Sequence, residues 1–188
     1  MRCLSIAVKR HFKFALVLIV AMMPLQCATL ERLSLDDLIA KSTAIVRGRI
    51  TGATAAFSGP VIYTHYTIQV SEKFKGANAG SVDVVVPGGV ANGLRQTFAG
   101  APVLHPGDEY VFFLYKGKSG LTTVTGLTQG LFSLPGNDGA DPTATRSASR
   151  ELMLDPANGR PVKDQTLILK LSDLRQRIAS GLKGASAK

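Results

Sequence analysis

Alternation of apolar and polar side chains is clearest between residues 61 and 74, and it predicts a β-strand there. A period of two places neighbouring side chains on opposite faces of a strand. The face expected to be buried carries Ile62, Thr64, Tyr66, Ile68 and Val70. The other face carries Tyr63, His65, Thr67 and Gln69. The segment is therefore expected to be half-buried, with one face on a core.

Shorter apolar runs predict further strands at residues 44–50, 81–86, 110–115, 121–125 and 131–134. Gly48 interrupts the first of these and predicts a bulge or sharp bend. The run 110–115 is continuously apolar, which is typical of a central strand. Small and turn-forming residues predict turns or loops at 51–60, 88–102 and 135–150, and a small hairpin at 151–162.

Helical spacing is found in two short segments. Ser34 precedes Leu35, and Asp36 and Asp37 follow, so a serine cap with acids in the first turn predicts a helix reaching Lys41. The second helix is predicted over residues 171–178. There Ser172 is the expected cap, and Leu174 and Ile178 share one side. Residues 181–188 are expected to form a frayed tail.

These elements predict a mainly β fold, an antiparallel barrel or sandwich of five to six strands flanked by short helices. The 19 glycines and nine prolines agree with many turns. The sequence contains no Gly-X-Y period and no sustained heptad, which excludes a collagen or a coiled coil. A hydrophobic fraction of 45% excludes a disordered chain.

Residues 1–28 have the pattern of a secretory signal peptide. A basic start carrying Arg2 and Arg10 leads into the apolar run 14–25, and small residues follow at Cys27 and Ala28. Cleavage is expected between Cys27 and Thr29, which predicts a secreted or periplasmic protein. One alternative is a membrane anchor, but the run is shorter than the ~20 residues that a span needs. A second is a lipoprotein acylated at Cys27, but the preceding residues fit that signal poorly.

Removal of residues 1–28 changes what chemistry remains. Four basic residues and no acids are lost, so the formal charge falls from +9 to +5. Cys3 and Cys27 are the two cysteines, and cleavage after Cys27 leaves neither disulfides nor thiol chemistry. The expected organisation is a β-barrel domain at 29–134. It is followed by a loop, a small hairpin and a helix at 135–188 that pack on it.

Several motifs in this order resemble the netrin-like, or tissue-inhibitor-of-metalloproteinase-like, domain. They are residues 42–50 (STAIVRGRI), 66–76 (YTIQVSEKFKG) and 105–114 (HPGDEYVFFL). Residues 87–89 (PGG), 100–102 (GAP) and 126–132 (GLTQGLF) also resemble segments of uncharacterised secreted bacterial proteins. The resemblance implies a five-stranded OB-like barrel. Inhibition of proteases in that family depends on a disulfide-fixed N-terminal cysteine, and no cysteine follows position 27 here.

Catalytic and metal-binding patterns are weak in the predicted mature chain. His65 and His105 are its two histidines, without the spacing of a zinc motif. Asp108 and Glu109 are neighbours on a predicted strand and so point to opposite faces. No Gly-x-Ser-x-Gly motif is present. We therefore expect no enzyme activity, no metal and no cofactor. A hydrolase using His65 or His105 is the alternative.

The long loop at residues 88–102 is the best candidate for binding, because long loops on a rigid barrel often carry function. Arg95 and Gln96 lie among its glycines, and we expect Gln129 to join them in a polar recognition patch. The competing interpretation is that these side chains only hold the loop. The predicted function is a non-catalytic binding module for a protein, peptide or envelope polymer, without nucleic-acid binding or a membrane span in the mature form. A protease inhibitor or protease-associated module is the alternative.

Overall fold

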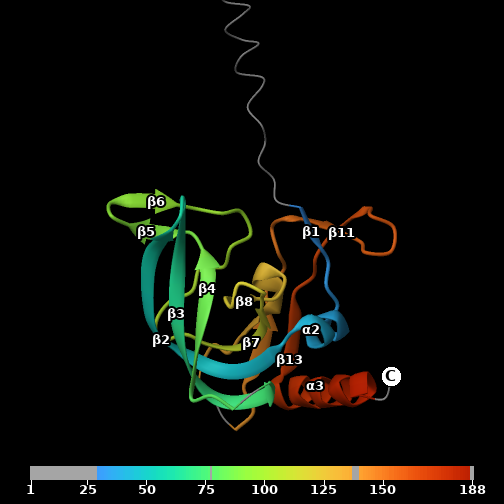
Figure 1. Cartoon of the computed structure of the whole chain (residues 1–188). Helices are drawn as coiled ribbons and strands as arrows, with labels where there is room; N and C mark the ends of the chain where they lie inside the picture. Colours follow the sequence, from blue (N-terminus) through green and yellow to red (C-terminus); the bar gives the residue numbers. More distant parts are fainter. Residues whose placement is uncertain (1–28, 77, 137–139, 187–188) are drawn as a thin grey trace, which may run out of the picture.

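A computed structural model describes residues 29–76, 78–136 and 140–186 (Figure 1). The predicted signal segment 1–28 lies outside these residues. As the sequence predicted, the fold is mainly β, with antiparallel pairing in its main sheet. The main sheet has eight strands, more than the five to six expected. In spatial order they are β13 (Leu167–Lys170), β10 (Thr143–Arg146), β9 (Leu131–Ser133), β7 (Glu109–Lys116), β2 (Ala44–Ser58), β3 (Val61–Lys75) and β4 (Ser81–Pro87), with β8 (Thr122–Val124) also paired to β7.

The centre of this sheet is a Greek key. Strands β2, β3 and β4 follow one another along the chain and pair in that order, and β7 returns to lie on the other side of β2. The ladder between β2 and β3 shifts between Arg47 and Gly48, which confirms the predicted irregularity. A Cβ atom at Gly48 would lie 2.6 Å from Ile68 Cγ2, so β3 crosses too closely for a larger residue.

Each face of the sheet has its own apolar core. One core is covered by the helices α2 (Leu35–Lys41) and α3 (Leu171–Ser186), and Phe113 and Phe132 lie fully buried within it. The second core lies inside the curve of β2, β3 and β4 and contains Ile68 and Phe112 (Figure 1). Strand β8 approaches β4 across this interior. No β4–β8 pairing is found among the described residues, so the curved sheet does not close into a barrel.

The predicted helices are both found. Ser34 caps α2, because its Oγ accepts from the Asp37 backbone N–H while the Asp37 carboxylate accepts from the Ser34 N–H. Helix α3 begins at Leu171, so Ser172 lies within its first turn and is not the cap that the sequence predicted. The Ser172 N–H and hydroxyl both donate to Asp141 instead. Arg175 joins α3 to β3 through two hydrogen bonds to Glu72, at 2.8 and 2.7 Å.

Three predicted loops or tails proved to be regular structure. Residues 51–58 continue β2, because the strong pattern of β3 pairs with them although they are small. Residues 143–146 form β10, whose Ala144 is fully buried in the helix-covered core. The tail predicted from residue 181 is wrong up to residue 186, since Leu182 packs on that core and extends α3.

Two small sheets complete the fold. β5 (Gly89–Ala91) and β6 (Leu94–Gln96) form a hairpin inside the predicted 88–102 loop. Its turn residues Asn92 and Gly93 both have positive φ, the geometry that an Asn-Gly turn favours. The hairpin predicted at 151–162 is confirmed by β11 (Leu152–Leu154) and β12 (Pro161–Val162). β1 (Thr29–Glu31) pairs in parallel with β11.

Candidate functional site

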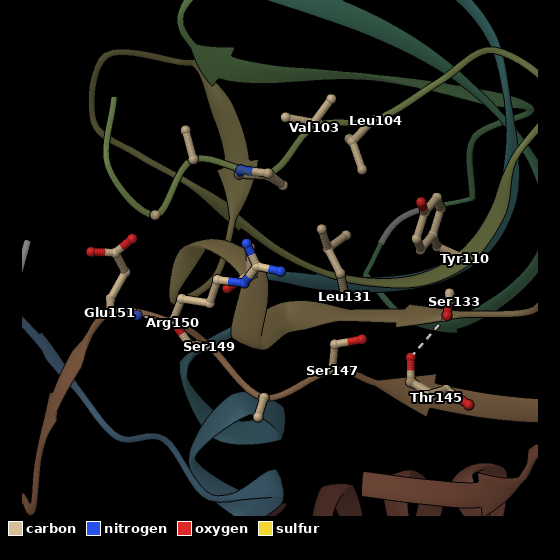
Figure 2. Close-up of a pocket in the computed structure, with 15 residues that line it drawn as sticks. Val103, Leu104, Tyr110, Leu131, Ser133, Thr145, Ser147, Ser149, Arg150 and Glu151 are labelled. Carbon is tan, nitrogen blue, oxygen red and sulfur yellow. Dashed lines mark hydrogen bonds between the residues drawn. The ribbon is translucent and has the colours of Figure 1, made fainter. Parts of the chain in front are cut away.

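A pocket of about 410 Å³ lies where residues 100–104 face residues 147–151 (Figure 2). We call it the Leu131 pocket after a residue of β9 that forms part of its lining. Its other walls come from the 3₁₀ turn η1 (Leu127–Gly130) and from the ends of β7 and β10. It is lined by Gly100, Ala101, Pro102, Val103, Leu104, Tyr110, Thr128, Leu131, Ser133, Thr145, Ser147, Ala148, Ser149, Arg150 and Glu151.

The lining combines an apolar surface with a row of hydroxyl groups. Leu104 and Leu131 are buried and supply apolar contact. The hydroxyl groups belong to Thr128, Ser133, Thr145, Ser147 and Ser149. The Ser133 hydroxyl donates to the backbone carbonyl of Thr145 at 3.1 Å, which joins β9 to β10. A mixed lining of this kind fits a ligand with both apolar and hydrogen-bonding groups.

Tyr110 places a phenol beside the apolar wall (Figure 2). Its hydroxyl donates to Asp108 Oδ2 at 3.3 Å. Burial is the main reason that the pKa of Tyr110 is raised to about 12, and the negative charge of Asp108 adds to the effect. The phenol therefore stays neutral at physiological pH and acts as a hydrogen-bonding group.

The wall at residues 147–151 is held in place by Asp164. One carboxylate oxygen accepts from Arg146 Nη2 at 2.7 Å, and the other accepts from the Ser149 backbone N–H at 2.9 Å. Arg146 and Asp164 are almost fully buried, so their ion pair is shielded from solvent. The Ser149 hydroxyl also accepts from the Glu151 N–H at 3.1 Å. These bonds fix the backbone of the wall before any ligand binds.

Arg150 and Glu151 place one positive and one negative side chain at the rim of the Leu131 pocket. Figure 2 shows the Arg150 side chain extending from the Ser149–Glu151 segment toward the wall that carries Val103. Arg150 is exposed, and its guanidinium has no hydrogen-bond or ion-pair partner among the described residues. The other cation of this wall, Arg146, is already paired with Asp164. Arg150 is therefore the one that is available to a ligand.

A smaller hollow of about 190 Å³ lies on the other side of residues 101–103. We call it the Arg95 hollow. It shares Ala101, Pro102 and Val103 with the Leu131 pocket, so these three residues form a ridge between the two. Val103 is 77% exposed on this ridge, an unusual position for a large apolar side chain. Arg95 is exposed and has no described partner for its guanidinium.

Gln96 is engaged by the backbone of the neighbouring hairpin. Its Oε1 accepts from the Ile62 N–H at 2.6 Å, and its Nε2 donates to the Pro60 carbonyl at 2.9 Å. Both hydrogen bonds tie β6 to the turn between β2 and β3. This is the structural role that the sequence left open as an alternative.

Gln129 does not join Arg95 and Gln96 in one patch, contrary to the assignment made from sequence. It is 1% exposed, and its Oε1 accepts from the Leu33 N–H at 2.8 Å. Its Nε2 donates to the Glu31 carbonyl at 3.0 Å. It lies beside a larger hollow of about 610 Å³ between β1 and β8. Because both ends of the amide are satisfied by the backbone, Gln129 holds the first described residues in place.

The two candidate catalytic histidines lie on the surface. His65 Nδ1 is 2.8 Å from Asp83 Oδ2, but both side chains are about half exposed. His105 is 70% exposed and 3.6 Å from Asp108 Oδ2. Neither histidine lines the Leu131 pocket or the Arg95 hollow. Within the described ranges, no three His, Cys, Asp or Glu side chains are grouped as metal ligands would be.

Sequence reasoning missed the wall at residues 147–151, which it treated as part of a loop or linker. The available signal was the alternation Thr-Ala-Thr-Arg at 143–146, which ends in a run of small hydroxyl residues. The Asn-Gly pair between Val90 and Leu94 was the missed signal for the β5–β6 hairpin.

Comparison with known proteins gives no family. No protein-family model matches the chain, and no curated protein matches it. In the part of the chain that the structure describes, no helix is both long enough and apolar enough to cross a bilayer.

Proposed function

We propose that this protein is a secreted or periplasmic, non-catalytic binding module for an extended polypeptide segment that carries a carboxylate. The observation that carries this proposal is the pair of exposed arginines, Arg95 and Arg150, on the two sides of the exposed Val103. Neither guanidinium has a partner in the described parts of the chain. An arginine donates two parallel hydrogen bonds to a carboxylate, so each guanidinium is available to bind one.

The surroundings of the two arginines favour a peptide over a small anion. A ligand crossing the ridge would contact Val103 and place a side chain against Leu131 and Leu104 in the pocket of about 410 Å³. The hydroxyls of Ser147 and Thr128 would hydrogen-bond to its backbone. Apolar anchors combined with a few directed polar groups are typical of peptide recognition.

We further propose that residues 29–134 form an OB-like barrel of the netrin-like class, partly open in this chain. The Greek-key order of β7, β2, β3 and β4 supports this assignment, because the OB fold is a partly open Greek-key barrel. The approach of β8 to β4 without pairing supports the open form. The motifs at 66–76 and 105–114 lie on β3 and at the start of β7.

The proposal is tested by selecting random linear peptides on the exported protein and measuring the affinity of an enriched sequence. Substitutions Arg150→Gln and Arg95→Gln are expected to weaken binding by about tenfold or more each, since a charged hydrogen bond is worth ~1.5–3 kcal/mol. The matched control is Arg160→Gln, at an exposed arginine of the β11–β12 hairpin outside both hollows. Unchanged binding of the enriched peptide after its Asp and Glu are replaced by Asn and Gln and its C-terminus is amidated would contradict the proposal. An equal effect of the control would contradict it as well.

A further inference from the structure

Two hairpin tips project from one end of the molecule (Figure 1). Both tips carry exposed apolar side chains. The first is the turn between β2 and β3, and the second is the β5–β6 hairpin. We call the two together the hairpin apex, residues 52–64 and 86–98. Phe57 is 39% exposed on the first tip, while Val90 and Leu94 are 49% and 61% exposed on the second. Single exposed apolar side chains are common on folded proteins, but several on neighbouring tips make a candidate interaction surface.

The apex is almost free of charge. Residues 52–64 contain no Asp, Glu, Lys or Arg, and residues 86–98 contain a single one, Arg95. Charged residues make up 19% of the whole chain, so this depletion is local to the apex. The absence of carboxylates is significant because a carboxylate is costly to bring near a hydrocarbon phase and is repelled by anionic headgroups.

Side-chain hydrogen bonds hold the two tips of the apex together. Gln96 ties the second tip to the first through Ile62 and Pro60, and the Thr64 hydroxyl donates to the Gly88 carbonyl at 2.7 Å. Arg95 pairs across the hairpin with Val90, which places a cation beside an apolar side chain on one face, while Leu94 points to the other face. An apolar tip with one flanking arginine and no carboxylate fits a membrane interface, where the apolar part inserts and the cation remains at the headgroups.

We propose that the hairpin apex is a lipid-binding surface, in which Phe57, Val90 and Leu94 insert into the interfacial region of a membrane and Arg95 contacts anionic headgroups. This is peripheral attachment and involves no membrane span. It shares none of the residues that line the Leu131 pocket, and its one residue in common with the proposed peptide site is Arg95 of the Arg95 hollow.

The test is flotation of the exported, processed protein with phosphatidylcholine vesicles that contain phosphatidylglycerol. Leu94→Asp is expected to lower the bound fraction by at least about tenfold, because it replaces an inserting apolar side chain with a negative charge. Phe57→Ser is expected to give a smaller loss in the same direction. The matched control is Ile168→Asp on the edge strand β13, where the isoleucine is 65% exposed. This control should bind as the unaltered protein does.

Three results would overturn the inference. One is absence of vesicle binding by the unaltered protein, and another is an equal loss in Leu94→Asp and Ile168→Asp. The third is binding that depends on phosphatidylglycerol but is unchanged by Leu94→Asp, since that would be surface electrostatics without insertion. Circular dichroism and the thermal midpoint of each variant show that it is folded. If Arg150→Gln binds vesicles as the unaltered protein does, lipid binding does not require the proposed peptide site.

Discussion

Gln129 offers the sharpest test of how this fold is held together. The change Gln129→Met keeps the side-chain length and apolar volume but removes both ends of the amide. The Leu33 N–H then loses its acceptor in a buried position, and the Glu31 carbonyl loses its donor. Glu31 ends β1 and Leu33 lies between β1 and α2, so the substitution weakens the attachment of β1 and of the segment that follows it.

The size of the effect follows from burial. Two neutral hydrogen bonds contribute about 1 kcal/mol each, and a buried donor without a partner costs ~1–3 kcal/mol. Because Gln129 is 1% exposed, water cannot replace the amide without rearrangement. The free energy of unfolding should therefore fall by about 2–4 kcal/mol. For a domain of this size that corresponds to a decrease in Tm of about 5–12 °C.

The chain provides its own control in Gln96, which also bridges two backbone groups. One of those bonds is part-buried and the other is exposed, so water can replace at least the second. Gln96→Met should cost less than about 1.5 kcal/mol. Urea unfolding of both variants, followed by circular dichroism, measures the difference. Equal losses in the two variants, or a loss below about 1 kcal/mol for Gln129→Met, would refute the reasoning from burial.

Three other outcomes are expected. The Asp37 pKa is lowered chiefly by the Ser34 hydroxyl, so this group stabilises the fold above its ordinary pKa of 3.8 and the stabilisation is lost as pH falls through the lower folded value. Ser34→Ala should cost about 1 kcal/mol near neutral pH and flatten this acid dependence in urea titrations. Gly48→Ala should destabilise by about 1–3 kcal/mol, because the added methyl meets Ile68 at 2.6 Å; a neutral result in thermal melts would contradict this close approach. The raised pKa of Tyr110 favours its neutral form in the fold, so stability should fall as pH rises from 10 toward 12, and Tyr110→Phe should remove that part of the dependence.

Local patterns in the sequence were sufficient for the strands with strong alternation. Ile62, Tyr66 and Ile68 are buried on the face that the period of two predicted. The capped helix at Ser34 was also predictable, because its cap and acidic first turn are local signals. The local sequence is sufficient to predict these elements, and the tertiary structure agrees with it.

The elements that were missed depend on partners distant in the sequence. Residues 51–58 are small and would not form a strand alone, but β3 supplies a full ladder for them. Ala144 gives β10 a buried position that composition does not reveal. At the candidate site, Arg95 and Arg150 come together only through the ridge at residues 101–103, which no local pattern predicts.

The attachment of β1 has a consequence for the order in which the chain assembles. Leu33 and Glu31 bind Gln129 across separations of 96 and 98 residues, and β1 pairs with β11, which lies further along still. The β2–β3 hairpin, in contrast, closes over one short turn and can form early. A chain that emerges with its N-terminus first must therefore leave its earliest strand unpaired until β11 has followed. The residues of β1 are therefore expected to be among the last of the described residues to become protected from hydrogen exchange.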